Sequence, residues 1–204
     1  MRQGGKVFRI GAALAAGIAV AALAIPSIGH VQTATASSTP TAVAGQASIW
    51  VSNNFNNSIT AYALDANGNA QPFALISVAS TGLSGNTGIA ANSSGNIYVA
   101  NGANNSISIY PPGSDGNAAP MTTISGSQTE LTRPNGIVAD SSGNMYVTDE
   151  GNNSVTIYSA GSSGDLAPIA TISGAARNLS TPQRIAVGSS GNIYVTNTSG
   201  DISC

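Results

Sequence analysis

Reactive and basic side chains are scarce in this chain. It has one cysteine and one histidine among its 204 residues, and charged residues make up 7% of it. Cys204 cannot form a disulfide within the chain, so it either pairs between two chains or has no structural role. Beyond residue 36 there is no histidine, no lysine and no internal cysteine, so the usual general bases and nucleophiles are missing. The sequence therefore predicts a protein that is not an enzyme and that needs no cofactor.

The first 36 residues have the composition of an export signal. Three basic residues precede an apolar segment at 10–28, and Ala34-Thr35-Ala36 provides a small-x-small cleavage site. We therefore expect a signal peptide at 1–36, then a linker or a first strand at 37–46, and a secreted or cell-surface protein. The alternative is an uncleaved anchor, because about 18 apolar residues approach the length that spans a membrane. Pro26 and the glycines of this segment favour cleavage.

Positive charge almost disappears once this leader is removed. Residues 37–204 keep three arginines and no lysine against eight acidic residues, which gives a net charge of −5. A surface so poor in cations cannot neutralise a phosphate backbone or dock on anionic lipid. We therefore expect no nucleic-acid partner and no membrane insertion after cleavage. Asn, Ser, Thr and Gly supply the polar surface instead, which favours a protein or a glycan as ligand.

A 48-residue period runs through the chain from residue 50 onward. Its clearest markers are four aromatic residues that lie 48 apart: Trp50, Tyr98, Tyr146 and Tyr194. The turn Ser-Ser-Gly-Asn recurs with the same spacing at 93–96, 141–144 and 189–192. Self-similarity of this length indicates one supersecondary unit that is used several times.

Each period contains four short segments with strand-like composition. In one copy they are 136–140, 145–148, 155–158 and 168–172, separated by turns rich in Gly, Asn, Asp and Ser. This pattern predicts a four-stranded antiparallel meander. A ring of such sheets packed face to face buries apolar residues on both faces, which is the β-propeller architecture, whereas a parallel β-helix would need a shorter period. The fold class we predict is an all-β propeller of four-stranded antiparallel blades at 47–204.

The best-defined copy resembles an NHL repeat. The resemblance is carried by 134–149, which has the sequence PNGIVADSSGNMYVTD, and by Asn152-Asn153-Ser154-Val155. It extends over 47–204 and is closest to the Ser/Asn/Gly-rich versions found in exported bacterial proteins. The resemblance implies that the segment Gly-Ile-Val-Ala-Asp is the innermost strand of its blade and lines a central channel. It also implies that the propeller acts mainly as a binding platform.

The number of periods bears on how the propeller is completed. Roughly three and a third periods are present between 47 and 204. A ring of fewer than four blades would leave large apolar sheet faces exposed. The chain is then either a piece of a longer propeller or a part that a second copy completes as a homo-oligomer.

The meander topology sorts the loops onto two faces of the propeller. The lower turns are nearly identical between copies, whereas the upper links differ and carry most of the ionisable side chains. Divergence and charge together predict that the upper face binds the ligand. The candidate binding residues are Glu130, Arg133, Asn135, Asp149, Glu150, Arg177, Gln183 and Arg184. The alternative is that Arg133 and Glu130 only pair across a solvated loop.

Two repeated sets of side chains have both a functional and a structural interpretation. Asn53, Asn101, Asp149 and Asn197 share one repeat position, where they either line the upper rim or bond the backbone of the following turn. The four aromatic residues of the period either stack on a carbohydrate or form the core between blades. Recurrence in every copy favours the structural interpretation for both sets.

A second class of function stays open, that of a fragment of a metal-dependent lactonase-like propeller hydrolase. Gluconolactonase-like and streptogramin lyase-like propellers are similar in appearance. The first need a divalent metal at the channel mouth, and the second rely on a histidine in the channel. The one histidine here, His30, lies in the leader. A hard-metal site is conceivable from carboxylates and an amide of the upper rim, namely Asp149, Glu150, Asn101 and Glu130. No spacing motif supports it, and we predict no metal.

Overall fold

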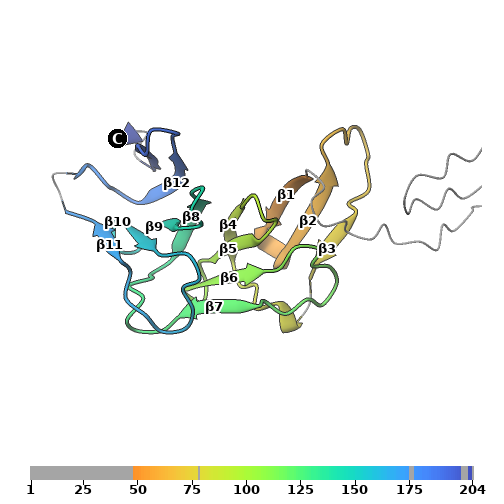
Figure 1. The fold of residues 1–204 in the computed structure, drawn as a ribbon, viewed down its shortest axis with the longest axis horizontal. Helices are drawn as coiled ribbons and strands as arrows, with labels where there is room; N and C mark the ends of the chain where they lie inside the picture. Colours follow the sequence, from red (N-terminus) through yellow and green to blue (C-terminus); the bar gives the residue numbers. More distant parts are fainter. Residues whose placement is uncertain (1–47, 78, 175–176, 199–201, 204) are drawn as a thin grey trace, which may run out of the picture. The chain divides into compact units, whose positions relative to one another are not determined.

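The computed structural model describes residues 48–77, 79–174, 177–198 and 202–203. In this part of the chain the regular elements are β-strands and two short 3-10 helices (Figure 1). The same residues contain no helix that is long and apolar enough to cross a membrane. The predicted signal peptide, the linker and the candidate first strand at 41–46 lie outside the described residues.

The strands form four antiparallel sheets that follow one another along the chain, which we call blades 1 to 4. Blade 1 contains β1 (Ser48–Asn53), β2 (Ser58–Ala63) and β3 (Ala74–Ile76), and blade 2 contains β4 (Asn86–Ala91), β5 (Ile97–Asn101), β6 (Ser106–Tyr110) and β7 (Thr122–Ser125). Blade 3 contains β8 (Pro134–Ala139), β9 (Met145–Asp149), β10 (Ser154–Tyr158) and β11 (Ala170–Ile172), and blade 4 contains β12 (Pro182–Val187), β13 (Ile193–Asn197) and β14 (Ile202–Ser203). The 3-10 helices are η1 (Asn54–Asn56) and η2 (Ala79–Thr81). The prediction of an all-β fold with four-stranded meanders is confirmed.

Two strands of blade 3 differ from the segments predicted for them. The outermost strand, β11, is shorter than 168–172 and pairs with β10 over three residues. The innermost strand, β8, begins at Pro134, and its pairing with β9 shifts in register between Pro134 and Ile137. The same shift occurs in β4 and β12. An irregularity at the upper end of each innermost strand is therefore part of the repeat.

Apolar side chains fill the spaces between neighbouring blades. One buried cluster joins blades 1 and 2, and its members are Ile59, Ile76, Ile97, Val99 and Tyr110. A second cluster joins blades 2 and 3, and it includes Tyr98, Ile107, Ile109, Met145, Val147 and Tyr158. Successive residues of a strand point to opposite faces of its sheet, so β5 contributes to both clusters. Tyr98 is thus a residue of the interblade core, as its recurrence predicts.

An asparagine that repeats every 48 residues ties each blade to the next. It accepts a hydrogen bond on Oδ1 from the backbone N–H of a residue 28 positions later. The three bonds join Asn57 to Gly85, Asn105 to Arg133 and Asn153 to Thr181, over 2.7, 2.8 and 2.7 Å. Each of these asparagines has a positive φ, which Asn tolerates better than most residues. The sequence Asn-Asn-Ser recurs at 56–58, 104–106 and 152–154, and its second asparagine therefore has a structural role between blades.

Candidate functional site

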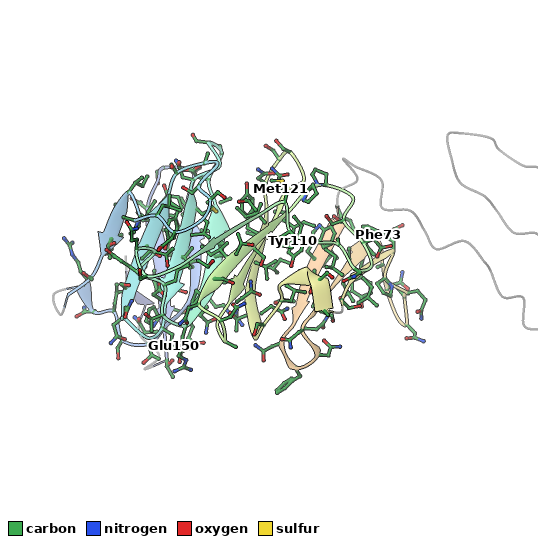
Figure 2. All side chains as sticks on the ribbon, turned by 90° about the horizontal axis from the view of Figure 1, so that it is seen from below. Phe73, Tyr110, Met121 and Glu150 are labelled. Carbon is green, nitrogen blue, oxygen red and sulfur yellow. The ribbon has the colours of Figure 1, made fainter. Side chains whose placement is uncertain are left out.

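The upper face is built from two kinds of segment that fold onto each other. These are the turns between the second and third strands of a blade and the links that enter the blade. Gly102 N–H donates to Gly85 O over 3.1 Å, and Gly151 N–H donates to Thr132 O over 2.9 Å. Figure 2 shows Glu150 at this edge of the blades and Met121 at the opposite edge. The loops are thus sorted as the meander topology predicts.

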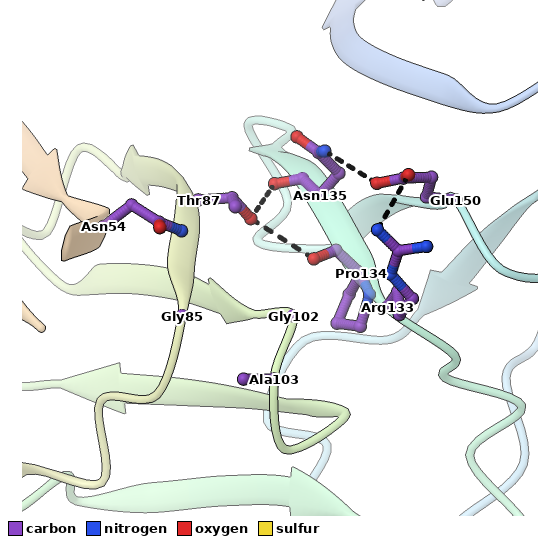
Figure 3. A pocket seen from close by; sticks show the side chains of 9 residues that line it. All are labelled: Asn54, Gly85, Thr87, Gly102, Ala103, Arg133, Pro134, Asn135 and Glu150. Atoms are coloured by element: carbon purple, nitrogen blue, oxygen red, sulfur yellow. Dashed lines mark hydrogen bonds and ion pairs between the residues drawn. The ribbon is translucent and has the colours of Figure 1, made fainter.

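A pocket of about 280 Å³ opens on this face where segments of blades 1, 2 and 3 meet (Figure 3). Its polar and charged wall is formed by Asn54, Thr87, Arg133, Asn135 and Glu150, and Pro134 also lines it. Small residues, Gly85, Gly102 and Ala103, form the remainder and leave room for a ligand. Three of the predicted binding residues therefore line one cavity.

Three polar side chains of the pocket and one neighbour form a continuous hydrogen-bonded chain. Arg133 Nη2 lies 3.0 Å from Glu150 Oε1. Asn135 Nδ2 donates to Glu150 Oε2 over 3.3 Å and to Gln183 Oε1 over 3.1 Å. The Arg133 side chain is 66% exposed and that of Glu150 is 17% exposed. Glu150 is thus held in place by two donors, while Arg133 reaches into solvent.

Asn135 carries an acceptor without a donor. The residue is 8% exposed, and its Oδ1 is buried and has no hydrogen-bond partner. A buried polar atom without a hydrogen-bond partner destabilises the folded state by about 1–3 kcal/mol, so such atoms are rare in native structures and need a physical explanation. Both amide hydrogens have acceptors, in Glu150 and Gln183. Exchanging the positions of the amide oxygen and nitrogen would therefore place the oxygen opposite two other acceptors. The site therefore lacks one donor.

One residue of the pocket wall, Arg133, has a backbone conformation that is unusual for a residue with a side chain. Arg133 has a φ of 55°, in the left-handed region that favours glycine. Gly85 occupies the same position one repeat earlier and has a φ of 57°. The 2.8 Å bond from Arg133 N–H to Asn105 Oδ1 holds this conformation. The fold thus places a long cationic side chain where the backbone itself prefers glycine.

The structure brings together four of the eight predicted binding residues. Arg133, Asn135, Glu150 and Gln183 form the hydrogen-bonded chain described above. Glu130 is exposed, and its Oε2 accepts from the Thr171 hydroxyl over 2.8 Å. Arg133 therefore pairs with Glu150 and not with Glu130, which corrects the alternative considered for these two residues. The turn geometry explains this, because Glu150 N–H donates to Arg133 O.

The other three predicted residues lie away from the pocket wall. Arg177 is exposed on the link that precedes β12. Arg184 is exposed on β12, where its N–H donates to Thr196 Oγ1 over 3.1 Å. Asp149 is fully buried, with Oδ1 accepting from Thr132 N–H over 2.6 Å and Oδ2 from Thr156 Oγ1 over 3.1 Å. Both oxygens of Asp149 thus bond groups within the fold and do not face a ligand.

The repeat position of Asp149 has a structural role in the other copies too. Asn101 Oδ1 accepts from Ser84 N–H over 3.2 Å, and Asn197 Oδ1 accepts from Ser180 N–H over 3.1 Å. These donors belong to the link that precedes the blade, not to the following turn. The structural interpretation is therefore right, but the partner expected from sequence is wrong. The link folds over the strand end, and local turn chemistry does not reveal this.

The conceivable metal ligands are not assembled into one site. Among the residues the structure describes, no three His, Cys, Asp or Glu side chains lie close enough together to hold a metal ion. Asp149 and Asn101 are buried, with their oxygens bonded within the fold. Glu130 instead bonds Thr171.

Sequence reasoning missed two polar residues of the pocket, Asn54 and Thr87. Thr87 lies one repeat before Asn135, and its Oγ1 donates to Asn135 O over 2.9 Å and to Pro134 O over 3.2 Å. Asn54 lies two repeats before Glu150. Aligning the copies at these two positions would have found both residues, because equivalent positions of neighbouring blades meet at the upper face.

Comparison with known proteins identifies one repeat and the fold. Residues 131–158 match the NHL repeat. None of the curated protein sequences matches this chain. Similar solved structures include catalytically inactive virginiamycin B lyase from Staphylococcus aureus with quinupristin, at 16% identity and a TM-score of 0.54, with 78% of this chain and 52% of that chain covered. Another is Myxococcus xanthus glutaminyl cyclase, at 13% identity and a TM-score of 0.53, with 78% and 62% covered.

A third similar structure is hydrazine synthase from Kuenenia stuttgartiensis, at 15% identity and a TM-score of 0.57, with 83% of this chain and 46% of that chain covered. Identities this low establish a likeness of fold. The chain spans about half the length of the lyases that it resembles. The matched repeat, 131–158, covers the end of a link and then β8, β9 and β10. Residues 131–158 of this protein thus match one NHL repeat, and the chain has the fold of a β-propeller.

Proposed function

We propose that this protein is a non-catalytic extracytoplasmic binding scaffold whose upper-face pocket receives the ligand. The observation that carries the proposal is the unpaired Oδ1 of Asn135, a buried acceptor on a residue that lines the pocket. Native folds rarely leave such an atom without a donor, so a ligand that supplies one gains affinity. The extracytoplasmic location rests on the signal-like composition of residues 1–36.

The side chains of the pocket are suited to binding a ligand and not to catalysing its conversion. Glu150 is the acidic residue of its wall, and both carboxylate oxygens are engaged, by Arg133 and by Asn135. A general base needs an oxygen within reach of the substrate proton, and here the ion pair competes for it. The structure with quinupristin is an example of a ligand held by a protein of similar fold. A ligand for this chain could likewise be a protein segment or a glycan.

Ligand-observed NMR with a mixed library of saccharides, short peptides and amino acids tests this proposal. Arg133→Gly is the pocket variant, because Gly85 shows that glycine fits this backbone position. Thr181→Gly is the control, since Thr181 has the same position one repeat later, a φ of 51° and no part in the pocket. We expect at least one compound to bind the wild type and the control and to bind Arg133→Gly at least about 5-fold more weakly.

Mass spectrometry of the bound compound separates a scaffold from an enzyme. We expect the compound to be recovered unchanged after incubation with the protein. Conversion to a product would contradict the non-catalytic role. Binding that is equal in wild type and Arg133→Gly would contradict the assignment of the pocket.

A further inference from the structure

An exposed aromatic residue, Phe55, directly follows a residue of the pocket wall in sequence and buries no surface against the fold. Phe55 belongs to η1 and follows directly on Asn54, which lines the cavity. Its side chain is fully exposed, so it buries nothing against the blades. Ala103 and Gly151 occupy the same position in the next two repeats. The fold therefore does not require a large apolar side chain here, and the exposed ring is free to contact a ligand.

The charges of the pocket cancel one another. Arg133 and Glu150 form an ion pair at 3.0 Å, and the other polar residues of the wall are amides and a hydroxyl. An anionic ligand would meet the carboxylate of Glu150, and a cationic one would meet the guanidinium of Arg133. Either charge would have to replace an interaction that already exists. The electrostatics therefore favour a neutral ligand.

The hydrogen-bonding groups of the pocket call for a ligand that is rich in donors and acceptors. Oδ1 of Asn135 lacks a donor, and Asn54 presents an amide to the cavity (Figure 3). Arg133 carries further N–H groups on a side chain that is 66% exposed. A hydroxyl group donates and accepts at once, so several hydroxyls on one small frame match this mixture.

The size of the cavity limits how much of a ligand it can enclose. The volume of about 280 Å³ lies just below the roughly 300–1,000 Å³ that small-molecule pockets span. A single six-membered ring with its substituents fits such a volume, whereas a folded peptide segment does not. The remainder of a longer ligand would have to run across the exposed upper face.

We propose that the pocket binds one ring of a neutral saccharide, with the apolar face of the sugar against Phe55 and its hydroxyls toward Asn135 and Glu150. In this pose the Asn135 amide turns toward the cavity, which alters its bonds to Glu150 and Gln183, and a ligand hydroxyl supplies the donor that Oδ1 lacks. Phe55 supplies apolar contact at little entropic cost. This inference rests on the proposed function, since it names the class of ligand for the same pocket.

Saturation-transfer NMR with the purified protein tests this inference. The probes are glucose, galactose, mannose, N-acetylglucosamine and their β-linked dimers, with glucuronate as a charged sugar and a set of tripeptides as the competing class. We expect transfer to at least one neutral sugar, and glucuronate to bind at least about 5-fold more weakly than the sugar with the same ring.

The repeat itself supplies substitutions that the fold accepts. Phe55→Ala copies Ala103, and Asn135→Thr copies Thr87. We expect Phe55→Ala to weaken sugar binding about 5-fold and Asn135→Thr about 10-fold, with unchanged circular dichroism. Met121→Ala is the control, since Met121 is 54% exposed at the opposite edge, and it should bind like the wild type.

The outcomes separate this inference from the proposed function. If only tripeptides bind, and Asn135→Thr abolishes their binding, the pocket is a ligand site but its saccharide class is wrong. If sugars bind equally to wild type and to both variants, they bind elsewhere, and the inference is overturned. If no probe of either class binds, both the inference and the proposed function are contradicted.

Discussion

Asp149 is the one carboxyl group at a repeat position that holds asparagine in the other three copies. Asn53 Nδ2 donates to Thr60 Oγ1 over 3.3 Å, and Asn101 Nδ2 donates to Ser108 Oγ over 3.0 Å. At Asp149 the equivalent hydroxyl, of Thr156, donates to the carboxylate instead. Burial raises the pKa of Asp149 to about 7, although hydrogen bonds from Thr132 and Thr156 oppose the rise. The carboxyl is therefore costly to ionise within the fold.

This burial predicts a fall in stability as the pH rises. Between about pH 4 and pH 7 the unfolded chain loses the Asp149 proton while the folded chain keeps it, so the folded state is disfavoured progressively. The full effect above pH 7 is on the order of 4 kcal/mol. Asp149→Asn restores the group found in the other copies, and we expect its free energy of unfolding to lose this pH dependence. Urea unfolding at pH 5 and pH 8 measures it.

The matched control is Asn101→Asp, which introduces a carboxyl at the same position of blade 2. We expect this variant to be less stable than the wild type at pH 8 and closer to it at pH 5. Asp140 affects the pH dependence of stability in the opposite direction. Burial tends to raise the pKa of this carboxyl, but hydrogen bonds from Asn144, Ser142 and Tyr146 lower it. Its contribution to the stability of the fold is lost only at pH values below the ordinary pKa range of carboxyl groups, which lies outside the interval from pH 5 to pH 8. Equal wild-type stability at pH 5 and pH 8 would refute the assignment.

The innermost strands of neighbouring blades approach each other at positions that lack a side chain. A Cβ on Gly88 of β4 would lie 2.2 Å from Asn135 O of β8. A Cβ on Gly136 of β8 would lie 2.6 Å from Gln183 O of β12. Arg184 occupies the same repeat position on β12 and is exposed. Glycine is therefore required where a further strand packs closely against the blade.

The loss of stability caused by a substitution at this repeat position should depend on whether another strand packs against it. We expect Gly136→Ala to destabilise the protein by about 1–3 kcal/mol, because the added methyl forces β8 and β12 apart. Gly88→Ala should cost more, since its contact would be shorter. Arg184→Ala, with no described strand beyond it, should stay within about 0.5 kcal/mol of the wild type. Chemical denaturation measures all three, and a neutral Gly136→Ala would show that the strands are not in close contact.

Local features of the repeat could be predicted from sequence, and contacts between repeats could not. The segment 145–148 was sufficient to place β9, because its composition and the flanking turns depend on neighbouring residues alone. The pocket joins Asn54 of blade 1 to Asn135 of blade 3, and only the packing of the blades brings them together. The bond from Asn105 to Arg133 likewise crosses from one blade to the next. Such partners follow from blade geometry, which periodicity does not specify.

The two outer blades carry apolar side chains on faces that no described residue covers. Ile49 and Val51 of β1 are 43% and 38% exposed, whereas Ile97 and Val99, one repeat later, are fully buried. Tyr194 of β13 is 42% exposed, whereas its equivalent, Tyr98, is 6% exposed. Within the chain, Tyr98 shares a buried cluster with Met145 and Tyr158, which are the repeat equivalents of Ile49 and Tyr62. The uncovered face of blade 4 thus matches the uncovered face of blade 1.

This match predicts that a second copy of the chain covers these faces, with Tyr194 of one copy against Ile49 and Tyr62 of the other. A hollow of about 350 Å³ lined by Ile49 and Tyr62 lies on blade 1 and can receive a tyrosine ring. We expect sedimentation velocity to show a dimer or larger ring at micromolar concentration, and Tyr194→Ser or Ile49→Ser to shift it to monomer. Ile169→Ser, which alters a more exposed apolar residue between β10 and β11, should leave the assembly intact. A wild-type protein that stays monomeric would show that these faces are not joined by a second copy.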